Sequence, residues 1–120
     1  MIEQAKADVA KRLERLPWPV YLYRPWDMSH LPCLVVSRPT VDNGSPVDIA
    51  AAFLITVPVL AIGRTYQDED SQVELDAVAD AVIDRFIDSN PIQVTAESEA
   101  VGGLVYPAFQ ILVSVGWRLC

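Results

Sequence analysis

The stretch that most restricts the fold is an apolar run, "IAAAFLITVPVLAIG", from Ile49 to Gly63. A transmembrane helix needs about 20 consecutive apolar residues, whereas this run is shorter and contains a proline. The aliphatic and β-branched residues from Val47 to Ile62 instead predict one long strand. Because Pro58 has no N–H to donate to a neighbour, we expect this strand to lie at a sheet edge or to bulge at the proline.

Two amphipathic patterns predict helices. The first lies at the N-terminus, where apolar residues recur at helical spacing, and it ends before Pro17. Its apolar residues are Ile2, Ala5, Val9, Leu13 and Leu16. The second is predicted to open at Ser71, because Ser71 and Glu74 form the S-x-x-E pattern of a capping box, and to end at Asn90-Pro91.

Shorter segments predict further strands separated by turns. The predicted strands are Val20–Tyr23, Cys33–Ser37, Ile92–Glu97 and Leu104–Leu119, the last interrupted by Pro107. The segments "TVDNGSPVD" and "SEAVGG" have the composition of turns. The order helix, strands, helix, strands, without a repeat or linker, predicts a single domain over residues 1–120. Its expected class is α+β, with a single mixed or antiparallel sheet packed against two helices on one face.

The charge and the cysteines restrict the class of protein. Nine basic and sixteen acidic residues give a net charge of −7. This charge argues against a protein that binds nucleic acid by neutralising its phosphates, because such a protein needs a basic face. The N-terminal segment has no apolar core of a secretory signal. Cys33 and Cys120 are too few for a disulfide framework or a zinc site, and we expect two free thiols in a reducing compartment. A soluble cytosolic product is therefore expected.

The predicted second helix carries a ladder of four aspartates at a spacing of four, at Asp76, Asp80, Asp84 and Asp88. Like charges at this spacing repel one another. Side chains along a helix point outward in parallel, whereas a metal ion or a pair of catalytic carboxylates needs groups that converge. Three interpretations stay open: a solvated face, a face that meets arginines of a neighbouring subunit, or a face that lines a space where negative charge is useful.

No motif of a catalytic or cofactor site is present in the sequence. His30 is the single histidine, and its neighbours Asp27, Ser29 and Cys33 lie too close in one segment for a catalytic triad. We therefore expect no enzyme, no cofactor and no metal.

The order of the whole chain resembles that of the tail terminator (tail completion) proteins of long-tailed bacteriophages. The resemblance rests on the amphipathic N-terminal helix, "PVYLYRP", "LPCLVVSRP", the apolar strand leading to "GRTYQDEDSQVELDAVADAVIDRF", and "YPAFQILVSVGW". It implies an α+β subunit of a hexameric ring that caps the tail tube, ends its polymerisation and forms the joint to the head. "DNGSP" departs from the family, whose members carry a longer loop there. The family has no known catalytic residues.

The resemblance implies several partners and a location. The partners are further copies of the chain, the tail tube protein, a head–tail connector protein and genomic DNA that passes through the lumen without specific binding, with no membrane. The location is the head-proximal end of the virion tail, and the host cytoplasm during assembly. The candidate lumen or inter-subunit residues are Asp68, Glu69, Asp70, Asp76, Asp80, Asp84, Asp88, Arg24, Arg38, Arg64 and Arg118.

Three alternatives remain beside this interpretation. The first is a head–tail connector component of the same class of particle. The second is a small cytosolic adaptor that dimerises through a proline-interrupted edge strand. The third is a small-molecule enzyme whose site has no recognisable motif.

Overall fold

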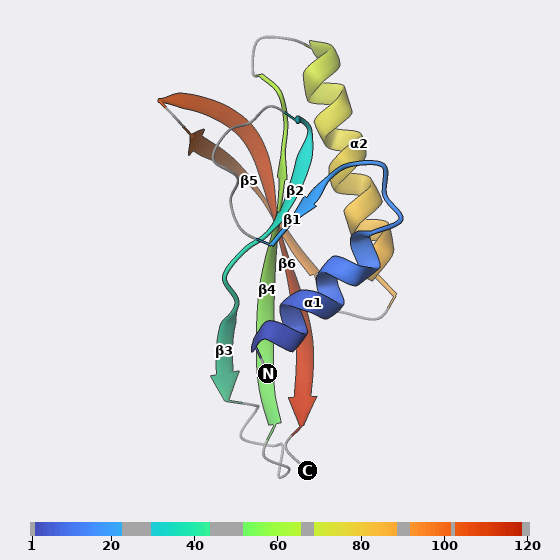
Figure 1. Cartoon of the computed structure of the whole chain (residues 1–120), viewed down its shortest axis with the longest axis vertical. Helices are drawn as coiled ribbons and strands as arrows, with labels where there is room; N and C mark the ends of the chain where they lie inside the picture. Colours follow the sequence, from blue (N-terminus) through green and yellow to red (C-terminus); the bar gives the residue numbers. More distant parts are fainter. Residues whose placement is uncertain are drawn as a thin grey trace.

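The computed structural model describes residues 2–22, 30–43, 52–65, 69–88, 92–101 and 103–118, without the side chains of 43, 52–53, 101 and 116–118. Over these ranges the chain forms two helices and one six-stranded sheet, so the α+β prediction is confirmed (Figure 1). The elements are α1 (Ile2–Leu13), β1 (Val20–Tyr21), β2 (Cys33–Val36), β3 (Thr40–Asn43), β4 (Ala52–Ile62), α2 (Glu69–Phe86), β5 (Ile92–Val101) and β6 (Leu104–Arg118).

The sheet is built around the two long strands β4 and β6. Its order is β1-β2-β4-β6-β5, and β3 pairs with β4 on the same side as β2. All of these pairs are antiparallel except β1 with β2, so the sheet is mixed. The expectation that the strand containing Pro58 lies at an edge is wrong, because β4 is paired on both sides. Its register with β6 is unbroken, whereas on the other side the register shifts by one residue between β2 and β3, opposite Pro58, so the irregularity expected at the proline lies in the neighbouring strand and not in β4.

The positions of two prolines explain how they fit inside the sheet. In an antiparallel strand the N–H and C=O of one residue point to the same side. The Pro58 carbonyl accepts a 2.8 Å hydrogen bond from the Ser37 N–H, so the missing donor of Pro58 faces the break between β2 and β3. The Pro107 carbonyl accepts a 2.8 Å bond from the Gly63 N–H, just beyond the end of β4. Each proline thus faces a gap in the neighbouring strand, and β6 runs through Pro107 without the predicted interruption.

Three boundaries also differ from the sequence prediction. Thr40–Asn43, expected in a turn, forms β3 against β4. The strand predicted to end at Glu97 continues to Val101, because β6 supplies a partner for every residue. The second helix begins at Glu69, so Ser71 is a buried residue of its first turn and not its N-cap.

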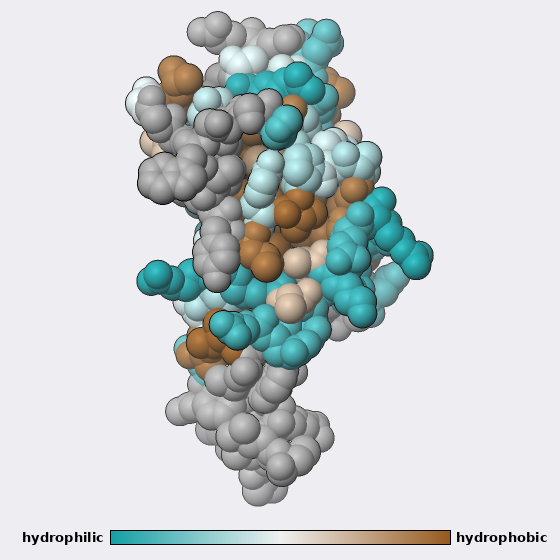
Figure 2. Space-filling model, in the orientation of Figure 1, coloured by the Kyte–Doolittle hydropathy of each residue, from teal (hydrophilic) through white to brown (hydrophobic). Residues whose placement is uncertain are grey.

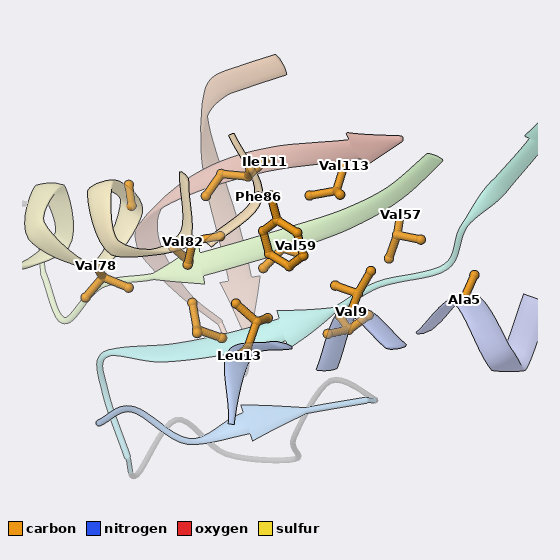
Figure 3. Packing of buried hydrophobic residues seen from close by; sticks show 14 of the residues in the cluster. Ala5, Val9, Leu13, Val57, Val59, Val78, Val82, Phe86, Ile111 and Val113 are labelled. Atoms are coloured by element: carbon orange, nitrogen blue, oxygen red, sulfur yellow. The ribbon is translucent and has the colours of Figure 1, made fainter. Parts of the chain in front are cut away.

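Both helices pack on one face of the sheet and form the main core with it (Figure 3). α1 contributes Ala5, Val9 and Leu13, each at most 2% exposed. Alternate residues of β4 and β6 point toward them, as the two-residue period of a strand requires. The sheet residues labelled in this core are Val57, Val59, Ile111 and Val113.

A smaller buried cluster lies on the opposite face of the sheet. It comprises Cys33, Val35, Leu60, Ile62 and Ala108. These residues alternate along β2 and β4 with residues of the main core. The two clusters together show that β2 and the C-terminal half of β4 are apolar on both faces, which explains why their sequence is a continuous apolar run.

Candidate functional site

The outer face of α2 is acidic, as the sequence predicted. Asp76, Asp80, Asp84 and Asp88 are exposed, as are Glu69 and Asp70 in the first turn. The opposite arc of the helix is buried in the main core through Leu75, Val78, Ala79, Val82 and Phe86. The apolar arc therefore packs in the core. The aspartate ladder lies on the exposed side of the helix, where it can contact solvent or a partner.

The ladder does not form a cation site. Its carboxylates follow the length of the helix and its end, and they do not gather around one point. Over the ranges that the structure describes, no three histidine, cysteine, aspartate or glutamate side chains are grouped so that they could hold a metal ion. What the ladder offers is an extended negative face.

One of the candidate arginines has a partner within its own chain. Arg64 follows β4, and its Nε lies 2.9 Å from Oε1 of Glu74 on α2. Both side chains are substantially exposed, at 57% and 38%. An exposed pair of this kind contributes at most about 1 kcal/mol. Arg64 therefore links the end of β4 to the first half of α2, and a contact with a neighbouring subunit would have to compete with this pair.

The remaining candidate arginines differ in how the structure places them. Arg38 is exposed in the segment between β2 and β3. Arg118 is the last residue of β6, and its side chain is outside the described part. Arg24 and Asp68 also lie outside the described residues. Of the candidate arginines whose side chains the structure describes, Arg64 is paired with Glu74 and Arg38 lies on a separate segment of the chain.

Arg12 is an important basic residue that the sequence analysis missed. It lies in the last turn of α1, and its Nη2 donates to the main-chain carbonyl of Arg85 near the end of α2. Its guanidinium is also 4.7 Å from the centre of the Phe86 ring. The positive charge of Arg12 interacts favourably with the negative C-terminal end of the α2 dipole and with the face of the aromatic ring. The basic last turn of α1 was the available signal, but the fold was needed to identify the partner.

The visible surface of the helical side is mixed in character. Figure 2 shows small, separate hydrophobic patches among hydrophilic side chains over the described part of this face. Val73 and Ile87, each 60% exposed, are large hydrophobic residues that α2 and its end contribute to the surface. A groove of about 650 Å³ is lined by Trp18, His30, Arg64 and Glu74 among others. Asp27 and Ser29, considered beside His30 in the sequence, lie outside the described residues.

Cys33 lies in the smaller cluster and is 1% exposed. Burial raises the pKa of its thiol from 9.0 to about 11, because removal from water disfavours the thiolate. The thiolate is the nucleophilic form, so a thiol with this pKa is inert at neutral pH. The structure therefore gives Cys33 a packing role.

We expect Cys33 to react with a thiol reagent at pH 8 much more slowly in the folded protein than in urea. The measurement uses a Cys120→Ser background, so that Cys33 is the only thiol that can be labelled.

The raised pKa of Cys33 also makes stability depend on pH. As pH rises, the unfolded thiol ionises near 9.0 while the folded thiol stays protonated until about 11. Its contribution to stability is therefore fully present below pH 9 and is lost between pH 9 and 11. Urea unfolding of Cys33→Ala as a control should lack this part of the pH dependence, and equal labelling rates in folded and unfolded protein would contradict the assignment.

The comparisons with known proteins add no relative. No protein-family model matches the chain, and no curated protein matches it. Among the described residues, neither helix has the length and apolar character needed to cross a membrane.

Proposed function

We propose that this chain is a structural subunit of a long-tailed bacteriophage virion. In this proposal six copies form a ring that caps the tail tube, ends its polymerisation and forms the joint to the head. The proposal is supported by the order of elements, because α1, the first strands, the long β4, α2 and the closing β5–β6 hairpin follow the order on which the sequence resemblance rests. Its partners are the neighbouring copies, the tail tube protein and a head–tail connector protein, with DNA passing through the lumen.

The observation that carries the proposal is that the two ends of the sheet are unlike each other. One end is the ten-residue strand β5, and the other is formed by the short strands β1 and β3. A ring requires heterologous contacts, in which one patch of a subunit meets a different patch of the next. Unlike ends of one sheet supply two such patches on the same subunit.

The alternative of an adaptor that dimerises through a proline-interrupted edge strand loses its structural basis. The strands that contain Pro58 and Pro107 are β4 and β6, and both are paired on two sides. The edge strand β5 contains no proline.

The function is tested by removing the chain from the particle whose genome encodes it. We expect overlong tails without heads, because nothing would stop polymerisation of the tube or receive the head. Electron microscopy with measured tail lengths provides the readout, and supplying the chain in trans should restore normal length. Tails of normal length with heads attached, in the absence of the chain, would refute the proposal.

In the assembled ring the aspartate ladder either meets arginines of the next subunit or lines the DNA channel. Asp80, Asp84 and Asp88 are exposed, so replacing all three by asparagine should leave the subunit folded. If the ladder meets arginines, rings of the variant weaken, and wild-type rings loosen as added salt shortens the Debye length below about 8 Å. If it lines the channel, rings persist and free DNA begins to adhere, because the repulsion of phosphates is reduced.

Native mass spectrometry and DNA retention on purified rings distinguish these two results. A matched control removes three exposed carboxylates of the other helical segment, through Glu3→Gln, Asp8→Asn and Glu14→Gln. Unchanged ring stability, salt response and DNA retention in the ladder variant would mean that the ladder is only a solvated face.

A further inference from the structure

The direction of the main-chain groups on the edge strand β5 follows from Pro107. The Pro107 carbonyl points toward β4, where it accepts the hydrogen bond from Gly63. Pro107 is therefore not hydrogen-bonded to its opposite residue on β5, which is Ser98. The main-chain N–H and C=O of Ser98 point away from β6, in the plane of the sheet and toward its outer edge. Because the register is unbroken, the same holds for Val94 and Ala96.

This edge has few of the features that protect exposed strands from pairing. Natural edges are commonly short, bulged, or interrupted by lysine or proline. β5 has ten residues, an unbroken register with β6, and neither lysine nor proline. All residues from Gln93 to Ser98 are exposed. Its charged residues are Glu97 and Glu99. They alternate with the residues whose main-chain N–H and C=O groups point toward the outer edge.

The opposite end of the sheet presents a second edge strand, β3, which pairs only with β4 among the described strands. The Pro58 carbonyl points toward β2 and β3, so Thr56, two residues earlier on β4, has its main-chain groups directed toward β3. Thr40 is opposite Thr56 and is hydrogen-bonded to it. The main-chain N–H and C=O of the next residue, Val41, therefore point away from β4. The Val41 side chain packs against the main core, on the same side of the sheet as Ile92 of β5.

We propose that β3 of one subunit pairs antiparallel with β5 of the next, which extends the sheet from subunit to subunit. Val41 would then lie opposite Val94 or, two residues along, opposite Ala96. In both registers two outward-pointing residues meet, so their N–H and C=O groups can form a hydrogen-bonded pair. The helix-bearing faces of both sheets also stay on the same side, because Val41 and Val94 share that face. This inference rests on the proposed ring, since it names the contact that would build it.

Charge favours this partner over a second copy of β5. In the first register Arg38, two residues before β3, comes near Glu97, and in the second it comes near Glu99. Pairing β5 with itself would instead bring two glutamates from each strand onto one face, in a chain with a net charge of −7. Like charges on adjacent strands are destabilising, whereas opposite charges are favourable. Since β3 provides only four residues, a single contact is small, and a closed ring gains from making it at every subunit.

The test places proline where it removes an outward N–H and leaves the bonds to β6 intact. Val94→Pro lies within the paired segment in both registers, and we expect it to raise the concentration needed for ring formation at least about tenfold. The matched control is Ala100→Pro, which removes an equivalent N–H on the same strand outside the paired segment and should assemble as the wild type does. Circular dichroism and thermal unfolding confirm that both variants are folded, and native mass spectrometry reports assembly.

A charge exchange supplies a second readout. Arg38→Glu should weaken assembly, and Glu97→Arg with Glu99→Arg in the same chain should restore it. Rings that form equally well with Val94→Pro would overturn the β3–β5 contact and leave the ring function standing. A wild-type dimer that Val94→Pro breaks would indicate self-paired β5, overturning both the contact and the ring. A wild-type chain that stays monomeric at high micromolar concentration would overturn the contact, and tail length in the deletion experiment would decide the function separately.

Discussion

Replacing Phe86 with alanine is expected to lower the free energy of unfolding by about 3–5 kcal/mol. Phe86 is 1% exposed and closes the end of α2 against the main core, where α1 and the sheet also meet (Figure 3). The change would leave a cavity where α1, α2 and the sheet meet, and it would remove the ring beneath the Arg12 guanidinium. Urea unfolding followed by circular dichroism measures the loss.

The control for this prediction is Asp84→Ala, on the exposed side of the same helix. It removes like-charge repulsion at a spacing of four residues, so it should be close to neutral or slightly stabilising. If the Phe86→Ala protein had nearly wild-type stability, Phe86 would not be a central residue of the core. A clearly destabilised Asp84→Ala protein would mean that the ladder makes necessary contacts within the chain.

The main elements were predictable where one physical signal was sufficient. The buried arc of α2, with Leu75 and Phe86, follows from helical periodicity, and the class α+β follows from the order of the elements. β3 was missed because "TVDN" has the composition of a turn and is a strand only through its pairing with β4. The extension of β5 to Val101 was missed for the same reason, since β6 supplies the partner.

The prolines show a limit of reasoning from one strand at a time. Pro58 correctly indicated a missing donor, and the sequence led to an edge strand as the usual solution. The structure has another solution, in which the neighbouring strand is interrupted opposite the proline. Which neighbour stops, and where, depends on the sheet order, and a single sequence does not state that order.

The candidate site was predicted in part. The exposure of the aspartate ladder followed from the apolar arc on the other side of α2. The pairing of Arg64 with Glu74 joins residues 10 apart along the chain, and the contact of Arg12 with Arg85 joins residues 73 apart, but both connect different elements of the fold. Long side chains of this kind reach many positions, so their partners become defined only when the backbone is placed.

The second large prediction concerns the contact that positions α2 on the sheet. Gly63 follows β4, and its N–H donates to Pro107. A Cβ at this residue would lie 3.1 Å from Cδ2 and 3.2 Å from Cβ of Leu75. The Cδ2 atom can move by a change of rotamer, whereas the Cβ atom moves only with the helix backbone. Gly63→Val is therefore expected to cost about 1–3 kcal/mol through overpacking.

A double-mutant cycle separates this contact from a general disturbance. Leu75 is 2% exposed, so Leu75→Ala alone should cost about 2–5 kcal/mol. In the double variant the truncated leucine makes room for the new side chain, and the total should be smaller than the sum of the two single costs. Strictly additive costs in urea unfolding would contradict the close approach at Gly63.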